Sequence, residues 1–108
     1  MTIQPAADRR EAAQRLLTWG DTGVVENAAV LLILDRSVLS MSLVCEALAT
    51  QDAAQDYEGQ ETILWVLAPA WESGEVDVPS LLREIRVTGN EGARLGAAIA
   101  IEWLQIDA

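Results

Sequence analysis

The chain has 108 residues, of which 51% are apolar, and carries a formal charge of -10. This length fits one domain with a core of its own, and the apolar content excludes an intrinsically disordered chain. The sequence contains 17 acidic residues and seven arginines, with no lysine or histidine. Such an acidic surface repels nucleic acid and anionic membranes, so we expect neither as a direct partner.

The single cysteine, Cys45, cannot form an internal disulfide, so nothing in the sequence calls for an oxidising compartment. Residues 1–14 contain no apolar run of the signal-peptide type. We therefore expect a cytoplasmic protein.

Residues 5–19 are predicted to form a first helix. Pro5 suits the first helical position, where its missing N–H has no partner to lose, and Gly20 is a natural stop. Apolar residues recur at the spacing of one helical face, which predicts that this face is buried. These residues are Ala12, Ala13, Leu16, Leu17 and Trp19.

The segment Val24–Leu34 is the most apolar in the chain, with seven consecutive apolar residues from Ala28 onward. Such a segment is apolar on every side and has no polar face to expose to water, which predicts that it lies in the middle of the molecule. We predict a helix over residues 22–35, capped by Asp21. A buried strand is the alternative, because short apolar runs do not distinguish the two. The run is too short to cross a bilayer, about 10 Å as a helix against ~30 Å of hydrocarbon.

Ser37 or Ser40 is predicted to cap a third helix that ends near residue 49. Cys45 lies on its apolar stripe, which is typical of a small buried residue. A nucleophilic thiol needs a base or a cation nearby to lower its pKa, and the chain has no histidine or lysine to serve. We therefore predict no catalytic role for Cys45.

Residues 50–60 are polar and are predicted to form a loop rich in carboxylates. The spacing does not fit a calcium-binding EF-hand, which needs ligands at loop positions 1, 3 and 5 and glycine at 6. Counted from Asp52, the third residue is Ala54 and the sixth is Tyr57. We therefore predict no metal site here, and no other cofactor.

Residues 61–71 are apolar again and fit one helical face, although Pro69 conflicts with a straight helix. The helix either kinks there or ends by Leu67, and Ile63–Leu67 as a strand is the alternative. Trp65 points away from the Ile63 face. It either packs on another helix, the commoner fate of tryptophan, or stays exposed as an interface anchor.

Residues 72–78 are predicted to form an acidic loop before a short helix over residues 80–87. Pro79 suits the start of that helix, and Gly89 suits its end.

Asn90 is predicted to cap a last helix that ends near Leu104 and is well buried. Small residues repeat every four positions along it and allow another backbone, such as that of a second subunit, to approach closely. They are Gly92, Gly96 and Ala100. With Val24–Leu34 and Leu95–Leu104 as the most buried segments, an aspartate at Val30 or Ile99 is expected to unfold the protein.

These elements predict an all-α fold, a compact single-domain bundle of five or six short helices.

The excess negative charge lies in the middle of the chain. Between Arg36 and Arg83, 46 positions carry no basic residue. The eight acidic residues in this interval are Glu46, Asp52, Asp56, Glu58, Glu61, Glu72, Glu75 and Asp77. A charge block is most often a solvated face, but it also suits a docking surface that steers a basic protein.

We therefore expect a non-catalytic protein that binds a basic, often nucleic-acid-binding, protein and inhibits or neutralises it. Immunity proteins, antiactivators and phage anti-defence proteins that mimic DNA charge act through the same physics. The predicted partner-binding residues are Asp52, Asp56, Tyr57, Glu58, Glu61, Trp65, Glu72, Glu75 and Asp77. The alternative is a structural subunit or assembly adaptor that forms a homodimer through apolar helix faces.

Overall fold

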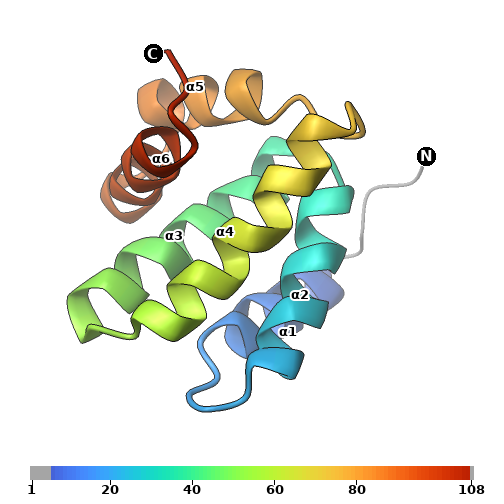
Figure 1. Cartoon of the computed structure of the whole chain (residues 1–108), viewed down its shortest axis with the longest axis vertical. Helices are drawn as coiled ribbons and strands as arrows, with labels where there is room; N and C mark the ends of the chain where they lie inside the picture. The colour runs from blue at the N-terminus through green and yellow to red at the C-terminus, as the bar shows by residue number, and fades with distance from the viewer. Residues whose placement is uncertain (1–5, 108) are drawn as a thin grey trace.

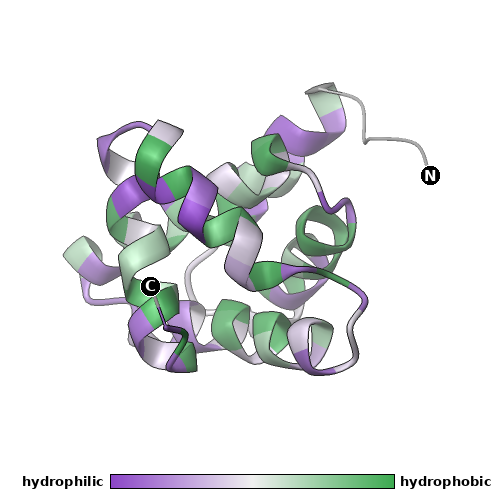
Figure 2. Cartoon of the chain, turned by 90° about the horizontal axis from the view of Figure 1, so that it is seen from above, coloured by the Kyte–Doolittle hydropathy of each residue, from purple (hydrophilic) through white to green (hydrophobic). Residues whose placement is uncertain are grey.

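Six helices and no strand make up residues 6–107, the part of the chain that the computed structural model describes (Figure 1). The predicted all-α bundle is thus confirmed. The helices are α1 (Ala6–Leu16), α2 (Thr22–Leu34), α3 (Val38–Ala54), α4 (Tyr57–Glu72), α5 (Val78–Thr88) and α6 (Glu91–Leu104). Hydrophobic and hydrophilic residues alternate along the ribbons, as amphipathic packing requires (Figure 2).

A side-chain cap begins each helix from α2 to α6. In every case a side-chain oxygen accepts a hydrogen bond from the backbone N–H three residues later, which satisfies a donor that the helix itself leaves unpaired. The caps are Asp21, Ser37, Asp56, Asp77 and Asn90. The caps predicted at Asp21 and Asn90 are confirmed, and Ser37 rather than Ser40 caps α3.

The central helix is α3, not α2 as the apolar run predicted. Helix α3 contacts all five other helices, whereas α2 packs mainly on α1 and α4 (Figure 1). Val30, on α2, keeps 38% of its surface exposed, and Leu31 keeps 36%. The burial of Val30 that underlies the Val30→Asp prediction is therefore wrong, because a carboxylate at this position can reach water.

Helix α3 is longer than predicted, and the expected loop over residues 50–60 shrinks to Gln55 and Asp56. The Gln51 side chain is buried and its Nε2 donates to the backbone oxygen of Leu16 at 2.8 Å, which ties this last part of α3 to the end of α1. Gln55 then ends the helix in the left-handed conformation, with φ at 61°.

Helix α4 continues through Pro69 to Glu72, so neither an end at Leu67 nor a strand over Ile63–Leu67 occurs. Ile63, Leu64 and Leu67 are fully buried, and Pro69 lies on the exposed side. The apolar face thus keeps the helix docked on both sides of the proline, which outweighs the hydrogen bond that proline removes.

The two faces of α6 differ from the prediction. Ala93, Gly96, Ala97 and Ala100 are buried, whereas Leu95 is 56% exposed and Ile99 is half-buried. A Cβ placed on Gly96 would lie 1.7 Å from the backbone oxygen of Cys45. The line of small residues therefore meets α3 of the same chain, and the expectation that Leu95–Leu104 is well buried throughout is wrong. Ile99 is half-buried, so the full burial that the Ile99→Asp prediction assumed is not present.

Helix α1 is shorter than predicted. It ends at Leu16, and Trp19 lies in the link to α2 with 69% of its surface exposed rather than on the buried face. Ala12 and Leu16 are buried as predicted, whereas Leu17, also predicted on the buried face, is 45% exposed. Pro5, the predicted first helical residue, lies outside the residues described.

Candidate protein-binding surface

One side of α4 faces solvent along its whole length. Its exposed residues are spaced three or four apart, which places them on one stripe of the helix. They are Glu58, Glu61, Trp65, Pro69 and Glu72. Trp65 is 64% exposed, and it also contacts a side chain of another helix, so each of the two alternatives for Trp65 holds in part. Along this stripe, glutamates lie both before and after Trp65.

Trp65 packs against Trp103 of α6. The ring centroids lie 5.5 Å apart and the rings are inclined by 80°, a T-shaped contact. Such pairs contribute about 0.5–1.5 kcal/mol beyond their buried area, which favours a fixed arrangement of both rings. Trp103 is itself 39% exposed. The pair is therefore an aromatic platform that spans α4 and α6 and is open to solvent.

A depression of about 360 Å³ lies beside this platform, where α3 meets α6. Its lining consists of Asp52 from the last turn of α3 and Ile99, Glu102 and Trp103 from α6. The Nε2 of Gln60 donates to Oδ1 of Asp52 at 3.4 Å, which links the start of α4 to the same place. Two carboxylates, an indole ring and an aliphatic side chain thus converge from separate helices.

We name the combined feature the Trp65–Trp103 surface. It comprises Asp52, Glu61, Trp65, Ile99, Glu102 and Trp103. Three of these residues, Asp52, Glu61 and Trp65, were predicted from the sequence. Trp103, Glu102 and Ile99 were missed, because the sequence placed α6 in the interior. The sequence pointed to these three residues only through the apolar side chains of α6, which occupy more of the helix circumference than one neighbouring helix can cover.

Asp56 does not belong to this surface. The residue is buried, and its Oδ1 accepts a hydrogen bond from the backbone N–H of Gly59 at 3.1 Å, which caps α4. The prediction of Asp56 as an exposed partner-binding residue is therefore wrong. The neighbouring Tyr57 is exposed, at the first position of α4.

The remaining predicted acids lie elsewhere. Glu72 and Glu75 lie at the far end of α4, and Glu58 and Glu72 are separated by about 21 Å along the helix axis. Asp77 is exposed, but its Oδ1 caps α5 by accepting from the N–H of Ser80. Glu46 accepts a hydrogen bond from Nδ2 of Asn90 at the start of α6. The central acids are thus spread over α3, both ends of α4 and the start of α5.

The Cys45 side chain is buried at the contact between α3 and α6. Burial, and secondarily the charge of Glu46, raises the pKa of the Cys45 thiol to about 12. A thiol that stays protonated at neutral pH is a poor nucleophile, and the prediction of Cys45 as a small buried residue is confirmed.

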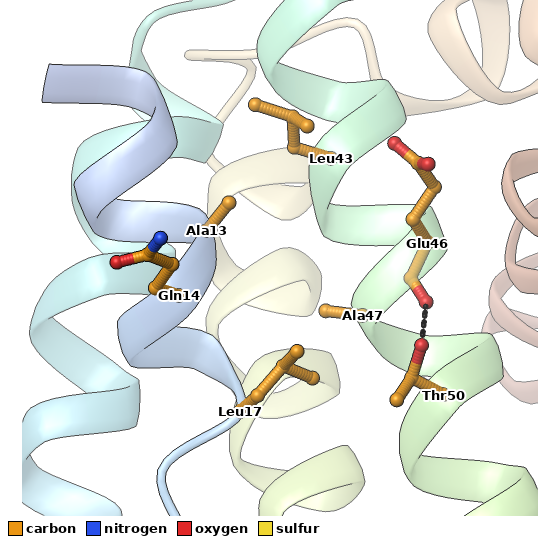
Figure 3. Close-up of a pocket in the computed structure, with 7 residues that line it drawn as sticks. All are labelled: Ala13, Gln14, Leu17, Leu43, Glu46, Ala47 and Thr50. Atoms are coloured by element: carbon orange, nitrogen blue, oxygen red, sulfur yellow. Dashed lines mark hydrogen bonds between the residues drawn. The ribbon is translucent and has the colours of Figure 1, made fainter. Parts of the chain in front are cut away.

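A second hollow, of about 270 Å³, lies between α1 and α3 (Figure 3). Leu17 borders it after the end of α1, and Leu43 and Ala47 border it on α3. The backbone oxygen of Glu46 accepts from the Thr50 hydroxyl at 3.0 Å, as Figure 3 shows. With one carboxylate in its lining, already bound to Asn90, this hollow offers apolar contact but little charge.

Comparison with protein-family models, curated proteins and solved structures found no match to this chain. Across residues 6–107, no helix combines the length and the apolar character needed to span a bilayer. Within the same range, His, Cys, Asp and Glu side chains form no group of three or more that is arranged to hold a metal ion.

Proposed function

We propose that this chain is a non-catalytic binding protein that covers a basic surface of another protein through the Trp65–Trp103 surface. A partner whose basic surface normally meets nucleic acid would be inhibited or neutralised by such coverage. The observation that carries this proposal is the exposed tryptophan pair with carboxylates around it on three helices.

The aromatic part supplies the affinity. Tryptophan is enriched among the few residues that dominate binding energy, each costing about 2 kcal/mol or more when truncated. Trp65 exposes 64% of its surface, and Leu95 and Ile99 extend the apolar area along α6. An exposed apolar area with a polar border is typical of a protein interaction site.

The acidic part selects the partner. The net charge of -10 attracts cationic surfaces at long range, and carboxylates at the contact reject acidic ones. Within residues 6–107, no arginine forms an ion pair with Asp52, Glu61 or Glu102. Their charges therefore remain available to a partner.

The same charges argue against self-association through this surface. A symmetric dimer would bring Asp52 and Glu102 of one copy towards those of the other, and like charges in contact are unfavourable. We therefore expect sedimentation to show a monomer at micromolar concentration. A dimer that Trp65→Ser dissociates would favour the homodimer alternative.

Catalysis is not part of the proposal. The thiol of Cys45 is buried and protonated. The carboxylates of the Trp65–Trp103 surface are exposed, whereas acid–base catalysis usually depends on a cleft that shifts a pKa.

The test compares matched tryptophan variants. The double variant Trp65→Ser, Trp103→Ser is compared with Trp19→Ser, because Trp19 is about as exposed as Trp65 but lies in the α1–α2 link. Cross-linking at low salt, followed by mass spectrometry, identifies the bound proteins and the residues in contact. We expect basic partners, at least ~10-fold less captured by the double variant and unchanged for Trp19→Ser.

Two outcomes would overturn the proposal. One is equal capture by the double variant and the wild-type chain. The other is binding that does not weaken between about 50 and 500 mM salt, because exposed charges are screened over this range.

A charge reversal measures the steering separately. Asp52, Glu58 and Glu61 are changed to lysine, while Asp56 is kept because its carboxylate caps α4. We expect association with the captured partner to slow by about 10-fold or more, with little change in melting temperature. An unchanged association rate would remove the acidic part of the proposal.

A further inference from the structure

The depression between α3 and α6 has a lining that suits one particular side chain of the partner. We infer that it is a subsite for a single arginine side chain, with Asp52 and Glu102 receiving the guanidinium and Trp103 stacking against it. This inference rests on the proposed function and specifies its chemistry.

Each lining group matches a part of arginine. The guanidinium is planar, presents five N–H donors and is weakly hydrated, so it both pairs with carboxylates and stacks on aromatic faces. A cation over an indole ring gains about 0.5–2 kcal/mol, depending on how far it is desolvated. The aliphatic side chain of Ile99 is available for the methylene stem of the arginine.

The lining is held from several directions. Asp52 lies on α3, and Glu102 and Trp103 lie on α6, two helices that pack closely together. Trp103 makes a T-shaped contact with Trp65, and Asp52 accepts a hydrogen bond from Gln60. Groups carried on packed helices lose little freedom on binding, which favours a specific contact over diffuse attraction.

The same lining disfavours lysine. An ammonium group is a compact, strongly hydrated point charge that neither stacks nor bridges two carboxylates in a plane. A general acidic surface attracts both cations alike, whereas this depression should discriminate between them. Preference for arginine over lysine is therefore the signature that separates a built subsite from net charge.

The experiment uses fluorescein-labelled nona-arginine and nona-lysine peptides as probes, with binding to the full chain followed by fluorescence anisotropy at about 50 mM salt. We expect the wild-type chain to bind nona-arginine at least ~10-fold more tightly than nona-lysine. Trp103→Leu should reduce this ratio to about 3 or less, and Trp19→Leu should leave it unchanged.

Two double variants with equal net charge test the carboxylates separately, because both keep Trp103. Asp52→Asn with Glu102→Gln removes two charges from the depression, and Glu72→Gln with Glu75→Gln removes two charges at the far end of α4. We expect the first pair to weaken nona-arginine binding at least ~10-fold and the second pair about 3-fold or less. All four residues are exposed, so both variants should fold, which circular dichroism melting checks.

The outcomes separate the inference from the proposed function. Equal affinity for the two peptides, or equal losses from the two charge pairs, would overturn the arginine subsite and leave acidic binding intact. Failure of both peptides to bind at low salt would overturn the subsite and the proposed function together.

Discussion

The two faces of α6 reverse the usual relation between side-chain size and burial. The face against α3 consists of small residues, with Gly96 in contact with the backbone at Cys45. The other face carries Leu95, Ile99 and Trp103, all wholly or partly exposed. Close backbone approach thus holds α6 in place while its large apolar side chains stay partly exposed.

The inner face explains why this arrangement is stable. With only small α6 side chains on this face, α3 and α6 approach closely at Gly96, where dispersion contacts are dense. The outer face is only partly covered within the chain and exposes apolar area whose contact with water is unfavourable. A partner that covers this area would recover that free energy, which is why the candidate surface lies here.

The largest expected effect comes from the inner face. Gly96→Ala places a Cβ inside the backbone of α3 and should lower the free energy of unfolding by about 3 kcal/mol or more. Gly92→Ala is the matched control, since its Cβ would meet its nearest neighbours at 3.7 and 3.8 Å, and it should be neutral or stabilise by up to ~1 kcal/mol. Urea denaturation measures both, and equal stability for the two variants would contradict the close α3–α6 contact.

The next effect concerns Cys45, beneath α6. Its thiol has a pKa raised from 9.0 to about 12 in the folded chain, so above pH 9 the unfolded chain releases a proton that the folded chain keeps. The stability that the buried thiol contributes is therefore full below pH 9 and declines by up to about 1.4 kcal/mol per pH unit above it. Chemical denaturation between pH 8 and about 11 should show this decline in the wild-type chain and a shallower one in Cys45→Ala. If the free energy of unfolding depended on pH equally in both proteins, the Cys45 thiol would not be shielded from water.

The contrast between inner and outer groups extends to the acids around α4. Asp56→Ala removes a buried cap and should cost about 1 kcal/mol, whereas Glu61→Ala, on the exposed stripe, should change stability by less than about 0.5 kcal/mol. Thermal melting compares the two variants, which have the same net charge. If Glu61→Ala lowered the melting temperature more than Asp56→Ala does, Glu61 rather than Asp56 would be the acid that stabilises the fold.

The smallest effect is expected on the outer face of α6. Leu95→Ala should shift the free energy of unfolding by less than about 0.5 kcal/mol, because the side chain is 56% exposed. The fully buried Leu82 of α5 supplies the control, and Leu82→Ala should cost about 2–5 kcal/mol. A cost for Leu95→Ala near that of Leu82→Ala would show that this face is covered within the chain.

The sequence by itself determined the helices and most of their starts. Asp21, Ser37 or Ser40, and Asn90 were readable as caps because capping joins a side chain to an N–H only three residues away. The apolar stripe around Cys45 was readable for the same local reason, since helical spacing alone sets which residues share a face. The cap at Asp56 was missed because the polar stretch around it resembled a loop.

The tertiary structure alone decided which faces meet. The apolar run of α2 predicted a central helix, but α3, with serine, glutamate and glutamine along it, contacts every other helix. Apolar content measures how much surface a helix can bury, whereas its place depends on which neighbours approach it and how closely. For α6 that decision rests on Gly96, whose missing side chain admits the backbone of α3 and turns Leu95 and Trp103 outward. The distant residues Asp52, Trp65 and Trp103 come together for the same reason, through packing between helices rather than through spacing within one.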